Sequence, residues 1–468
     1  MNLPSDKKSL LDRLGDRLGF LHGRPSPSDT KLEQHLAEVR DKLGLNVRPG
    51  PDDDGWADTP PVTLDDGTRL HLYKDGEAAA AAYDAIQSAR WRVLLEIYIW
   101  PDDETGRCFA ELLAKKAREG VKVFVIFDSF GSLMADAKMF ASMREAGVQV
   151  LEFHPMTPWH SRWGWRPLNR DHRKLVVVDD RLAGVGGLNI GNDYAGTWVA
   201  HDAKVGLDEL WRDAGIGFVG KEATEMFARA FDCTWSYLTE RVKMRRALVV
   251  EGLDVGVRRA GRLGKVRHAY NEFQPRPGKH PTDLIEPGRS IACIGSAPTL
   301  ASPLRPFLYR LVRDARKSLL LTMAYFAPDD ELIEGLCAAA RRGVRVRLVI
   351  AGKTDAKVLL VAARAFYRRL LEAGCEVYER QGAMLHQKSI VADGELTILG
   401  STNLDYRSIE FNLELSAVVR SRELARQVEL MFDHDTMFSN RIELSDWRER
   451  PYADRLVQWT VSRLRYLL

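Results

Sequence analysis

Hydrophobic residues occur in short runs that alternate with helical segments, and this pattern appears twice. Around Ala117 the chain reads AREGVKVFVIFD, and around Ala340 it reads ARRGVRVRLVIAG. In both places the end of a helix is followed by a glycine and then by a strand rich in β-branched residues. Two further pairs of segments match in the same order, 94–103 with 320–330 and 144–153 with 371–380. The chain therefore contains two copies of one α/β unit.

The alternation of helices with apolar strands predicts the fold class. We expect two α/β/α sandwich domains related by a pseudo-twofold axis, each with a largely parallel central sheet covered by helices on both faces. The predicted organisation is a polar N-terminal leader with an amphipathic helix (1–64), a first domain (65–235), a basic linker (236–292), a second domain (293–440) and an amphipathic C-terminal tail (441–468).

Composition narrows the class of protein. Of the 468 residues, 45% are hydrophobic and 28% are charged, which is typical of a soluble globular protein. The 68 Lys and Arg residues are nearly balanced by 65 Asp and Glu residues, so overall charge does not favour a nucleic-acid partner. The five cysteines are scattered and form no CxxC pair, which argues against a disulfide scaffold and against a zinc site built from cysteines.

The sequence predicts contact with a membrane from its surface. No segment approaches the ~20 apolar residues that span a bilayer, and the start of the chain lacks the features of a secretory signal. We therefore expect peripheral association with the cytoplasmic membrane. The candidate contacts are leucines at helical spacing in residues 10–21, the basic run 241–267, the tryptophans Trp159, Trp163 and Trp165, and the C-terminal Trp459 and Tyr466 among arginines. Packing on the protein body or simple solvation is the alternative for each.

A polar motif recurs late in each copy. The first copy reads HRKLVVVDDRLAGVGGLN and the second reads HQKSIVADGELTILGSTN. The shared residues, at identical spacing, are His172, Lys174, Asp179, Gly186 and Asn189 in the first copy and His386, Lys388, Asp393, Gly400 and Asn403 in the second. A single His-x-Lys on an apolar strand is more often packed in a core, but its duplication with the same Gly and Asn favours a functional site.

This motif suits chemistry at a phosphodiester. Residues two apart on a strand face the same side, so each histidine projects together with its lysine. If the two copies face each other, two His, two Lys and two Asn side chains converge, and the Lys and Asn donors can bind phosphate oxygens. One imidazole then attacks phosphorus to form a phosphohistidine, and the other protonates the leaving alkoxide and deprotonates the incoming hydroxyl. Because lysines supply the positive charge, we expect neither a metal nor another cofactor.

Carboxylates near the motif have two predicted roles. A neutral, attacking imidazole needs a hydrogen-bond acceptor on its second nitrogen. We predict that Asp213, in WRDAGIGFV, orients the histidine of the first copy, and that Glu414, in FNLELSAVV, orients that of the second. A surface carboxylate or a structural ion pair is the alternative for both. Asp179 and Asp393 are predicted to be structural residues that close a turn or pair with a neighbouring base.

The duplicated motif HxK(x)4D(x)6G(G/S)xN resembles that of the phospholipase D superfamily, over most of residues 65–440. Within that superfamily, GSTNLDYRSIEFNLE is most similar to bacterial cardiolipin synthases of the phospholipase D type. The resemblance implies that a phosphatidyl group passes from one phosphatidylglycerol, through an enzyme histidine, to the hydroxyl of a second lipid. It also implies that His172 is the nucleophile and His386 the acid/base. Many members of that group carry N-terminal transmembrane helices, so this chain resembles the shorter, peripheral type.

Three alternatives stay open at this point. The first is a phospholipase D hydrolase that uses water as acceptor and releases phosphatidic acid. The second is a metal-independent phosphodiesterase or endonuclease, which is disfavoured because we find no stripe of aromatic and basic residues for a nucleic-acid strand. The third is a binding module with an inactive pocket, which is disfavoured because both His–Lys pairs are intact. The expected partner is thus a phospholipid, not a nucleic acid.

Overall fold

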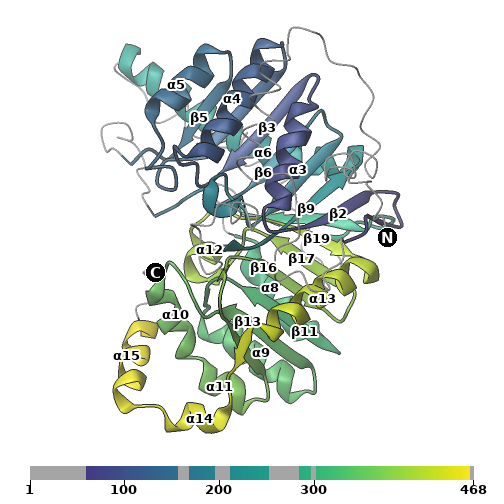
Figure 1. The fold of residues 1–468 in the computed structure, drawn as a ribbon, viewed down its shortest axis with the longest axis vertical. Helices are drawn as coiled ribbons and strands as arrows, with labels where there is room; N and C mark the ends of the chain where they lie inside the picture. Colours follow the sequence, from purple (N-terminus) through teal and green to yellow (C-terminus); the bar gives the residue numbers. More distant parts are fainter. Residues whose placement is uncertain (1–58, 157–167, 196–210, 252–283, 297–301, 464–468) are drawn as a thin grey trace, which may run out of the picture.

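The protein is described by a computed structural model that covers residues 59–156, 168–195, 211–251, 284–296 and 302–463. In the last turns of α6 the backbone alone is described. The expected N-terminal amphipathic helix, the three closely spaced tryptophans, Tyr466 and the side chains of the basic run lie outside these ranges. Figure 1 shows the two halves of the chain, one above the other along the longest axis of the molecule.

The first half contains one sheet, its helices and a short bridging strand. Its elements are β1 (Val62–Thr63), β2 (Arg69–Lys74), α3 (Glu77–Gln87), β3 (Arg92–Ile97), α4 (Glu104–Arg118), β4 (Lys122–Asp128), α5 (Ala137–Glu145), β5 (Gln149–Phe153), β6 (Leu175–Val178), β7 (Leu182–Gly186), the 3-10 helix η3 (Asn192–Tyr194), β8 (Trp211–Arg212), β9 (Ala214–Val219) and α6 (Lys221–Glu251).

The second half repeats this order and adds helices at its end. Its elements are β10 (Ile291–Gly295), α8 (Leu304–Asp314), β11 (Ser318–Met323), β12 (Phe326–Ala327), α9 (Asp330–Arg341), β13 (Arg345–Ala351), α10 (Lys357–Arg364), α11 (Tyr367–Glu372), β14 (Glu376–Arg380), β15 (Met384–Leu385), β16 (Lys388–Ala392), β17 (Leu396–Gly400), β18 (Leu404–Asp405), α12 (Tyr406–Glu410), β19 (Leu415–Arg420), α13 (Arg422–Met437), β20 (Ser439–Arg441), α14 (Leu444–Glu449) and α15 (Tyr452–Arg463).

The two sheets share one topology of seven strands. The first sheet has the order β1-β2-β9-β7-β6-β3-β4-β5, and the second has the order β10-β19-β17-β16-β11-β13-β14-β20. The seven strands β2-β9-β7-β6-β3-β4-β5 of the first sheet correspond one by one to β10-β19-β17-β16-β11-β13-β14 of the second. The extra strand is β1 at one edge of the first sheet and β20 at the opposite edge of the second. The internal repeat expected from the sequence is therefore a repeat of the whole sheet.

The sheets are mixed, which corrects the prediction that they are largely parallel. Only β3-β4-β5 and β11-β13-β14 pair in parallel, and all other neighbours within the two sheets are antiparallel. The helix–glycine–strand segments in the sequence are the crossovers that connect the parallel strands. The other strands include the tight hairpins β6–β7 and β16–β17, and a short turn can join only antiparallel neighbours.

Local signals in the sequence explain why the matching helices begin and end where they do. Asp103 caps α4 by accepting a hydrogen bond from the amide of Gly106 (2.7 Å), and Asp329 caps α9 in the same way through the amide of Leu332 (2.9 Å). Both helices are followed by a glycine with positive φ, Gly120 (89°) and Gly343 (91°). A left-handed conformation costs glycine little, so the chain turns sharply into the next strand.

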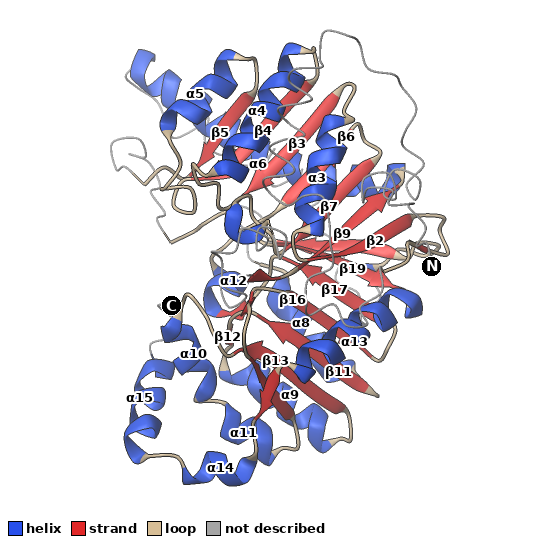
Figure 2. Cartoon of the chain, in the orientation of Figure 1, coloured by secondary structure: helices blue, strands red, loops and turns tan. Residues whose placement is uncertain are grey.

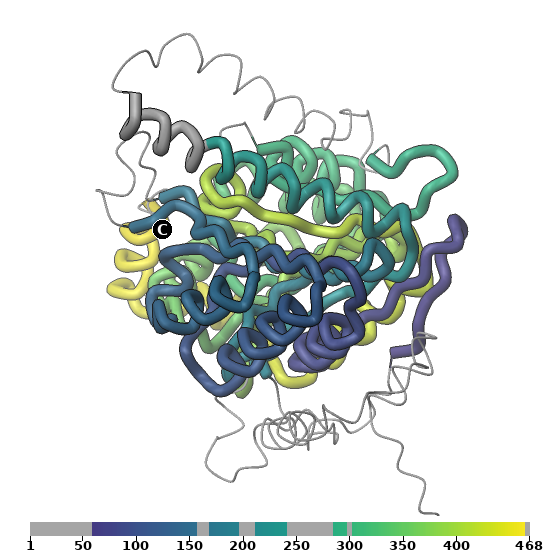
Figure 3. The backbone as a smooth tube through the Cα atoms, turned by 90° about the horizontal axis from the view of Figure 1, so that it is seen from above, coloured from purple at the N-terminus to yellow at the C-terminus, as the bar shows by residue number. Residues whose placement is uncertain are grey.

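Three apolar cores divide the molecule into layers. One lies between the first sheet and α3, α4 and α5, and another lies between the second sheet and α8, α9 and α11. The third contains residues of both sheets together with α6 and α13, so it joins the two halves. Figure 2 shows helices on either side of the strands of each half, and Figure 3 views the molecule from above, with the first half in front of the second.

The elements extend past several of the expected domain boundaries. Helix α6 runs through position 235, and Tyr237 and Leu238 are buried in the core that joins the halves. The expected linker therefore begins inside a packed helix. At the other end, β20 crosses position 440 and pairs with β14, so the second sheet includes the first residue of the expected tail.

Candidate active site

Each histidine lies next to its lysine at the start of a central strand. His172 and Lys174 directly precede β6, while His386 precedes β16 and Lys388 begins it. In both pairs the lysine Nζ donates a hydrogen bond to the backbone carbonyl of the histidine two residues earlier, at 2.7 Å in the first pair. All four side chains are buried. The strand thus presents each histidine together with an ammonium group, as the spacing of two predicts.

The four side chains from the two halves act on one another electrostatically. Burial and then the charge of Lys388 lower the pKa of Lys174 to about 7. Burial lowers the pKa of Lys388 to about 8. Burial and both lysines lower the pKa of His172 and of His386, the latter to about 3. The two lysines together form an electropositive site that favours an anion, and the histidines are neutral without one.

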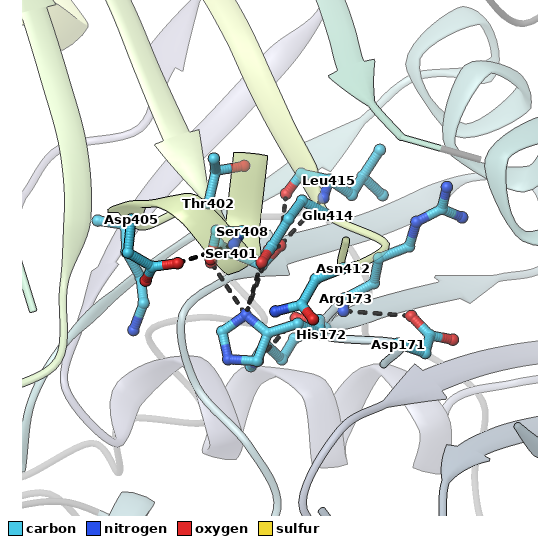
Figure 4. Close-up of polar contacts among 12 residues, drawn as sticks. Asp171, His172, Arg173, Ser401, Thr402, Asp405, Ser408, Asn412, Glu414 and Leu415 are labelled. Atoms are coloured by element: carbon cyan, nitrogen blue, oxygen red, sulfur yellow. Dashed lines mark hydrogen bonds and ion pairs between the residues drawn. The ribbon is translucent and has the colours of Figure 1, made fainter. Parts of the chain in front are cut away.

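His172 is oriented by two acceptors from the second half. Its Nδ1 lies 3.2 Å from the carbonyl oxygen of Ser401 and 3.1 Å from Oε1 of Glu414. The hydroxyl of Ser401 donates a hydrogen bond to the same carboxyl group. Figure 4 shows these groups converging on Nδ1. Because a carbonyl oxygen can only accept, Nδ1 carries the proton, and the lone pair of the neutral ring is on Nε2.

His386 is oriented by a carboxylate from the first half. Its Nδ1 lies 2.7 Å from Oδ2 of Asp213, whose other oxygen accepts a hydrogen bond from the amide of Ala214 (2.7 Å). Burial acts to raise the pKa of Asp213, but His386 and Lys388 outweigh burial, and the pKa is lowered. The imidazole is also enclosed by aromatic rings, with the ring centre of Trp211 4.9 Å away. This histidine therefore pairs with an ionised carboxylate.

The structure corrects the predicted pairing of acids with histidines. Asp213 does not orient His172, and Glu414 does not orient His386: each acid serves the histidine of the other half. The reason is a pair of backbone contacts between the halves. The amide of His172 donates to the carbonyl of Leu413 (2.9 Å), and the amide of His386 donates to that of Arg212 (2.7 Å). The residue that follows each carbonyl is an acid, Glu414 or Asp213, and the contact places this acid beside the histidine of the other half.

The two asparagines of the motif lie at the ends of the neighbouring strands and are buried. Oδ1 of Asn189 accepts a hydrogen bond from the amide of Ile99 (3.1 Å), which orients the amide group. Oδ1 of Asn403 has no hydrogen-bond partner among the described residues. Nδ2 of Asn189 also lacks a partner among the described residues, so this buried amide can donate a hydrogen bond to a phosphate oxygen.

Asp179 and Asp393 lie at the far ends of the motif strands. Asp179 accepts hydrogen bonds from the amides of residues 90, 91 and 92 at 2.7 to 2.9 Å. Asp393 accepts from the amides of residues 316, 317 and 318. Both aspartates have positive φ, 50° and 56°. Each carboxylate thus closes the turn into β7 or β17 against the start of β3 or β11, which supports a structural role.

A buried ionic network beside His172 is absent from our sequence-based expectations. Arg173 lies between Glu96 (3.5 Å) and the hydroxyl of Thr234 (2.8 Å), and burial followed by repulsion from Glu96 raises the pKa of Asp171. Asp128 accepts a hydrogen bond from the amide of Asp171 (2.8 Å). The sequence does contain a signal for this network: in the segment NRDHRK (169–174), four of six residues are charged, and an apolar strand follows. The network holds the segment that carries His172.

A second such network holds Asp213. Nη1 of Arg212 donates to Asp75 (2.9 Å), and its Nε donates to Asp435 of α13 (3.0 Å). Asp75 also accepts a hydrogen bond from the amide of Asp213 (2.9 Å). Because Asp435 belongs to the second half, this ion pair fixes the acid and joins the halves at once. Within the described ranges, no three His, Cys, Asp or Glu side chains are grouped so as to hold a metal ion.

Both halves match one family of known proteins. A family profile described as "Cardiolipin synthase, PLD-like domain" matches residues 83–197 and 308–436, which together make up more than half of the chain. The chain belongs to this family. Each matched range contains one complete His-x-Lys motif, so family membership extends to both halves of the site. The resemblance inferred from the motif is confirmed.

Individual relatives agree with the family. The chain is 30% identical over 408 residues to the cardiolipin synthase of Geobacillus thermodenitrificans, covering 86% of this chain and 72% of that protein. It is 27% identical over 398 residues to the probable cardiolipin synthase YwiE of Bacillus subtilis, covering 84% and 71%. Among solved structures, phosphatidylserine synthase of Haemophilus influenzae superposes with a TM-score of 0.60 at 15% identity, covering 92% of this chain and all of that one. This likeness confirms the phospholipase D-like fold.

Proposed function

We propose that this protein makes cardiolipin by transferring the phosphatidyl group of one phosphatidylglycerol to the hydroxyl of a second. As a member of the family, the chain is an enzyme of the phosphatidyltransferase type. The observation that carries the more specific proposal is the exchange of acids between the halves. Two buried His–Lys pairs each receive an acceptor from the opposite half, which makes a single site with two histidines ready for different roles.

In the first step, Nε2 of His172 attacks the phosphorus atom of bound phosphatidylglycerol. A P–N bond forms and the P–O bond to the headgroup glycerol breaks, while a proton moves from Nε2 of His386 to the leaving alkoxide. The products are free glycerol and a phosphatidyl-histidine. Lys174 and Lys388, with the two asparagines, bind the non-bridging oxygens on which negative charge develops.

In the second step, the P–N bond breaks and a new P–O bond forms. Nε2 of His386, now unprotonated, takes the proton of the hydroxyl of a second phosphatidylglycerol as that oxygen attacks phosphorus. The P–O bond of cardiolipin forms, the P–N bond to His172 breaks, and both histidines return to their starting states. Because the site is buried, water is at a disadvantage against a lipid hydroxyl, which supports transfer over the alternative of hydrolysis.

The substrate itself supplies the electrostatic condition for acid catalysis. Burial and the charge of Lys388 lower the pKa of His386, and Asp213 opposes them. An anionic phosphodiester bound between the lysines neutralises their repulsion of the imidazolium, so the pKa of His386 rises when substrate is bound. The protonated form of His386 then accumulates in the enzyme–substrate complex, where it acts as the acid.

The decisive test is product analysis with the purified enzyme. Vesicles of phosphatidylglycerol are incubated with the protein in buffer containing EDTA, and lipids are measured by mass spectrometry. We expect cardiolipin and glycerol in equal amounts, because each turnover makes one of each, and no effect of EDTA. Phosphatidic acid as the only lipid product would show a hydrolase instead, and a strict requirement for added cation would contradict the role given to the lysines.

We also propose that the enzyme meets the membrane through two exposed apolar segments. No helix in the described part of the chain has the length and hydropathy needed to cross a bilayer. On α15, Tyr452, Leu456, Val457 and Trp459 are more than half exposed, and Arg463 lies over the ring of Trp459 (5.3 Å). Leu133 and Met134 are exposed in the loop that follows Asp128. Aromatic, aliphatic and basic groups together suit the headgroup boundary of a cytoplasmic membrane.

Vesicle binding tests this contact. We expect that Leu456→Ser together with Trp459→Ser weakens co-sedimentation with phosphatidylglycerol vesicles by roughly tenfold or more, because two large apolar groups leave the bilayer. Turnover of short-chain, monomeric substrate stays unchanged, since α15 is outside the active site. Equal binding of the variant and the parent protein would exclude α15 as the contact.

A further inference from the structure

A cavity adjoins the motif lysine at the same place in each half. The first-half cavity is lined by five alanines of α3, by apolar residues and glycines of β6, β7 and β9, and by Lys174 and Asn189. The second-half cavity is lined by three residues of α8, by apolar residues of β16 and β17, and by Lys388. The two sets occupy corresponding strands of the repeated sheet, so the cavities are counterparts.

The counterparts differ in size because the first is built from smaller side chains. Val176 pairs across the strands with Gly184, whereas at the corresponding place Ile390 pairs with Ile398. The covering helix differs in the same sense. In the first half α3 presents Ala78, Ala79, Ala81, Ala82 and Ala85, and in the second half α8 presents Leu304, Phe307 and Leu308. The first-half cavity has a volume of about 120 Å³, and the second has about 10 Å³.

The larger cavity is a mostly apolar groove that is partly open to solvent, and two motif residues, Lys174 and Asn189, are among those that line it. Val176 and Leu182 are half-buried although they belong to central strands of the first sheet, while Ile390 and Leu396, at the corresponding positions, are buried. The groove ends at two groups that also belong to the phosphate site, Lys174 and Asn189. A ligand that fills it therefore combines an anionic group at that end with an apolar body.

We propose that this first-half groove binds an acyl chain of the phospholipid whose phosphate lies at Lys174. The proposal rests on the proposed function and deepens it, because it names the part of the substrate that sets specificity. Small-molecule sites in proteins typically have mostly apolar walls and a few polar groups that fix the orientation of the ligand, and this groove has both. A glycerol headgroup does not suit these walls, since its hydroxyls would lose hydrogen bonds to water without replacement.

The difference between the halves also assigns a direction to the substrate. The second-half cavity is narrowed by Ile398 and by the large side chains of α8, so it does not admit a chain of similar length. One acyl chain of the bound phosphatidyl group thus runs beneath α3, and its headgroup oxygen points away from the first half. Each buried methylene group strengthens binding by a factor of about four.

The test varies the substrate and the groove together. Ala82→Leu with Ala85→Leu fills the groove from α3, and Ala82→Ser with Ala85→Ser is the matched control that keeps it open. Monomeric phosphatidylglycerols with chains of four, six and eight carbons serve as substrates. For the parent protein and the serine control, we expect KM to fall by about fourfold for each methylene bound. In the leucine variant we expect the fall in KM between four and eight carbons to be at least tenfold smaller than in the parent protein.

The outcomes separate the groove from the reaction. Equal chain-length dependence in the leucine variant and the parent protein overturns the groove proposal while turnover still supports the function. Absence of turnover by the parent protein with every substrate overturns the function. In that case, or if the leucine variant does not fold, the groove is tested directly in the parent protein with a phosphatidylglycerol carrying a diazirine on one acyl chain. Labelling of residues 77–87 and 182–188 supports it, and labelling confined elsewhere, including residues 1–58, overturns it.

Discussion

The two halves carry the same motif but hold their histidines in different environments. His172 faces Glu414, whose pKa is raised to about 7 by burial, and shares this carboxyl group with Ser401. His386 faces Asp213, whose pKa is lowered because His386 and Lys388 outweigh burial. An ionised carboxylate stabilises an imidazolium more strongly than a carboxyl group that is itself close to neutral. The comparison therefore favours His386 as the acid/base and His172 as the neutral nucleophile.

The two halves also differ in the residue that directly follows the motif glycine. Ser401 follows Gly400 in the second half, and the corresponding residue of the first half is Gly187, after Gly186. A Cβ atom at position 187 would clash with the carboxylate of Asp213. The serine therefore adds a hydrogen-bond donor to one acid, and the glycine leaves the space that lets the other approach its histidine. A duplicated site can thus acquire two roles through changes beside the shared residues.

The largest expected effect comes from the histidines themselves. His172→Ala and His386→Ala each lower kcat with phosphatidylglycerol by on the order of 10⁴-fold or more, because both act in one reaction. With a p-nitrophenyl ester as donor, whose leaving group needs no proton, His386→Ala still forms a covalent phosphatidyl enzyme and His172→Ala does not. Intact-protein mass spectrometry after acid-free quenching measures this. An adduct in His172→Ala alone would exchange the two assignments.

Neutralising the acids has the next largest effect and tests the exchange between halves. Asp213→Asn lowers kcat by on the order of 10²–10⁴-fold, since it removes the charge that stabilises the imidazolium. Glu414→Gln has a smaller effect, because the neighbouring Ser401 carbonyl still fixes the ring. In double variants, Glu414→Gln adds nothing to His172→Ala, because the pair acts as a unit. If Glu414→Gln were instead non-additive with His386→Ala, Glu414 would act on the histidine of its own half.

The residue beside each acid has an intermediate effect. Gly187→Ala lowers kcat by roughly tenfold to 100-fold, because Asp213 must move to avoid the new methyl group. Ser401→Ala lowers it by about tenfold, the loss of one hydrogen bond to a carboxyl group. The pH profile of kcat separates the two: Ser401→Ala moves the limb that reports Glu414, and Gly187→Ala does not. Identical pH profiles of kcat for Ser401→Ala and Gly187→Ala would mean that Glu414 and Asp213 have the same role.

The structural aspartates affect stability and leave catalysis unchanged. Asp179→Asn and Asp393→Asn each lower the free energy of unfolding by about 1–3 kcal/mol, because a charged acceptor of several backbone amides is lost. Denaturant titration measures the loss, and kcat per folded enzyme stays within about twofold. A large fall in kcat with unchanged stability would place either residue in the reaction.

The last expected effect, similar in size to that of the structural aspartates, is on the pH dependence of stability. The pKa of Lys174 falls from 10.5 to about 7 in the folded protein, so between these values the unfolded chain binds more protons. The free energy of unfolding therefore rises with pH in this window, by about 1.4 kcal/mol per pH unit for one full proton. Denaturant titrations from pH 7.5 to 9.5 measure the slope. Lys174→Met reduces it, and an unchanged slope would show that Lys174 is not the group responsible.

Much of the fold and of the site follows from local signals in the sequence. The Asp caps at 103 and 329, the glycines after α4 and α9, and the β-branched runs that follow predict the crossovers of both halves. The spacing of two places His172 with Lys174, because alternation along a strand depends only on the residues of that strand. Duplication of the motif then indicates one site shared by two halves.

Other features depend on contacts between residues far apart in the chain. The antiparallel strands of each sheet cannot be predicted from helix–strand alternation, because pairing direction depends on which edges meet. The partner of Asp213 depends on the backbone contact between Arg212 and His386, 174 residues apart, and no local pattern specifies it. The groove beneath α3 likewise exists because alanines of a helix meet glycines of two strands.

The sequence by itself therefore determined the chemistry, since the identity and spacing of His, Lys and Asn decide what a site can do once it is formed. Only the tertiary structure decided which acid serves which histidine and where the substrate has room. The physical reason is that these are properties of the interface between two halves. Hydrogen bonds and van der Waals contacts there act over a few ångströms of space, whatever the distance along the chain.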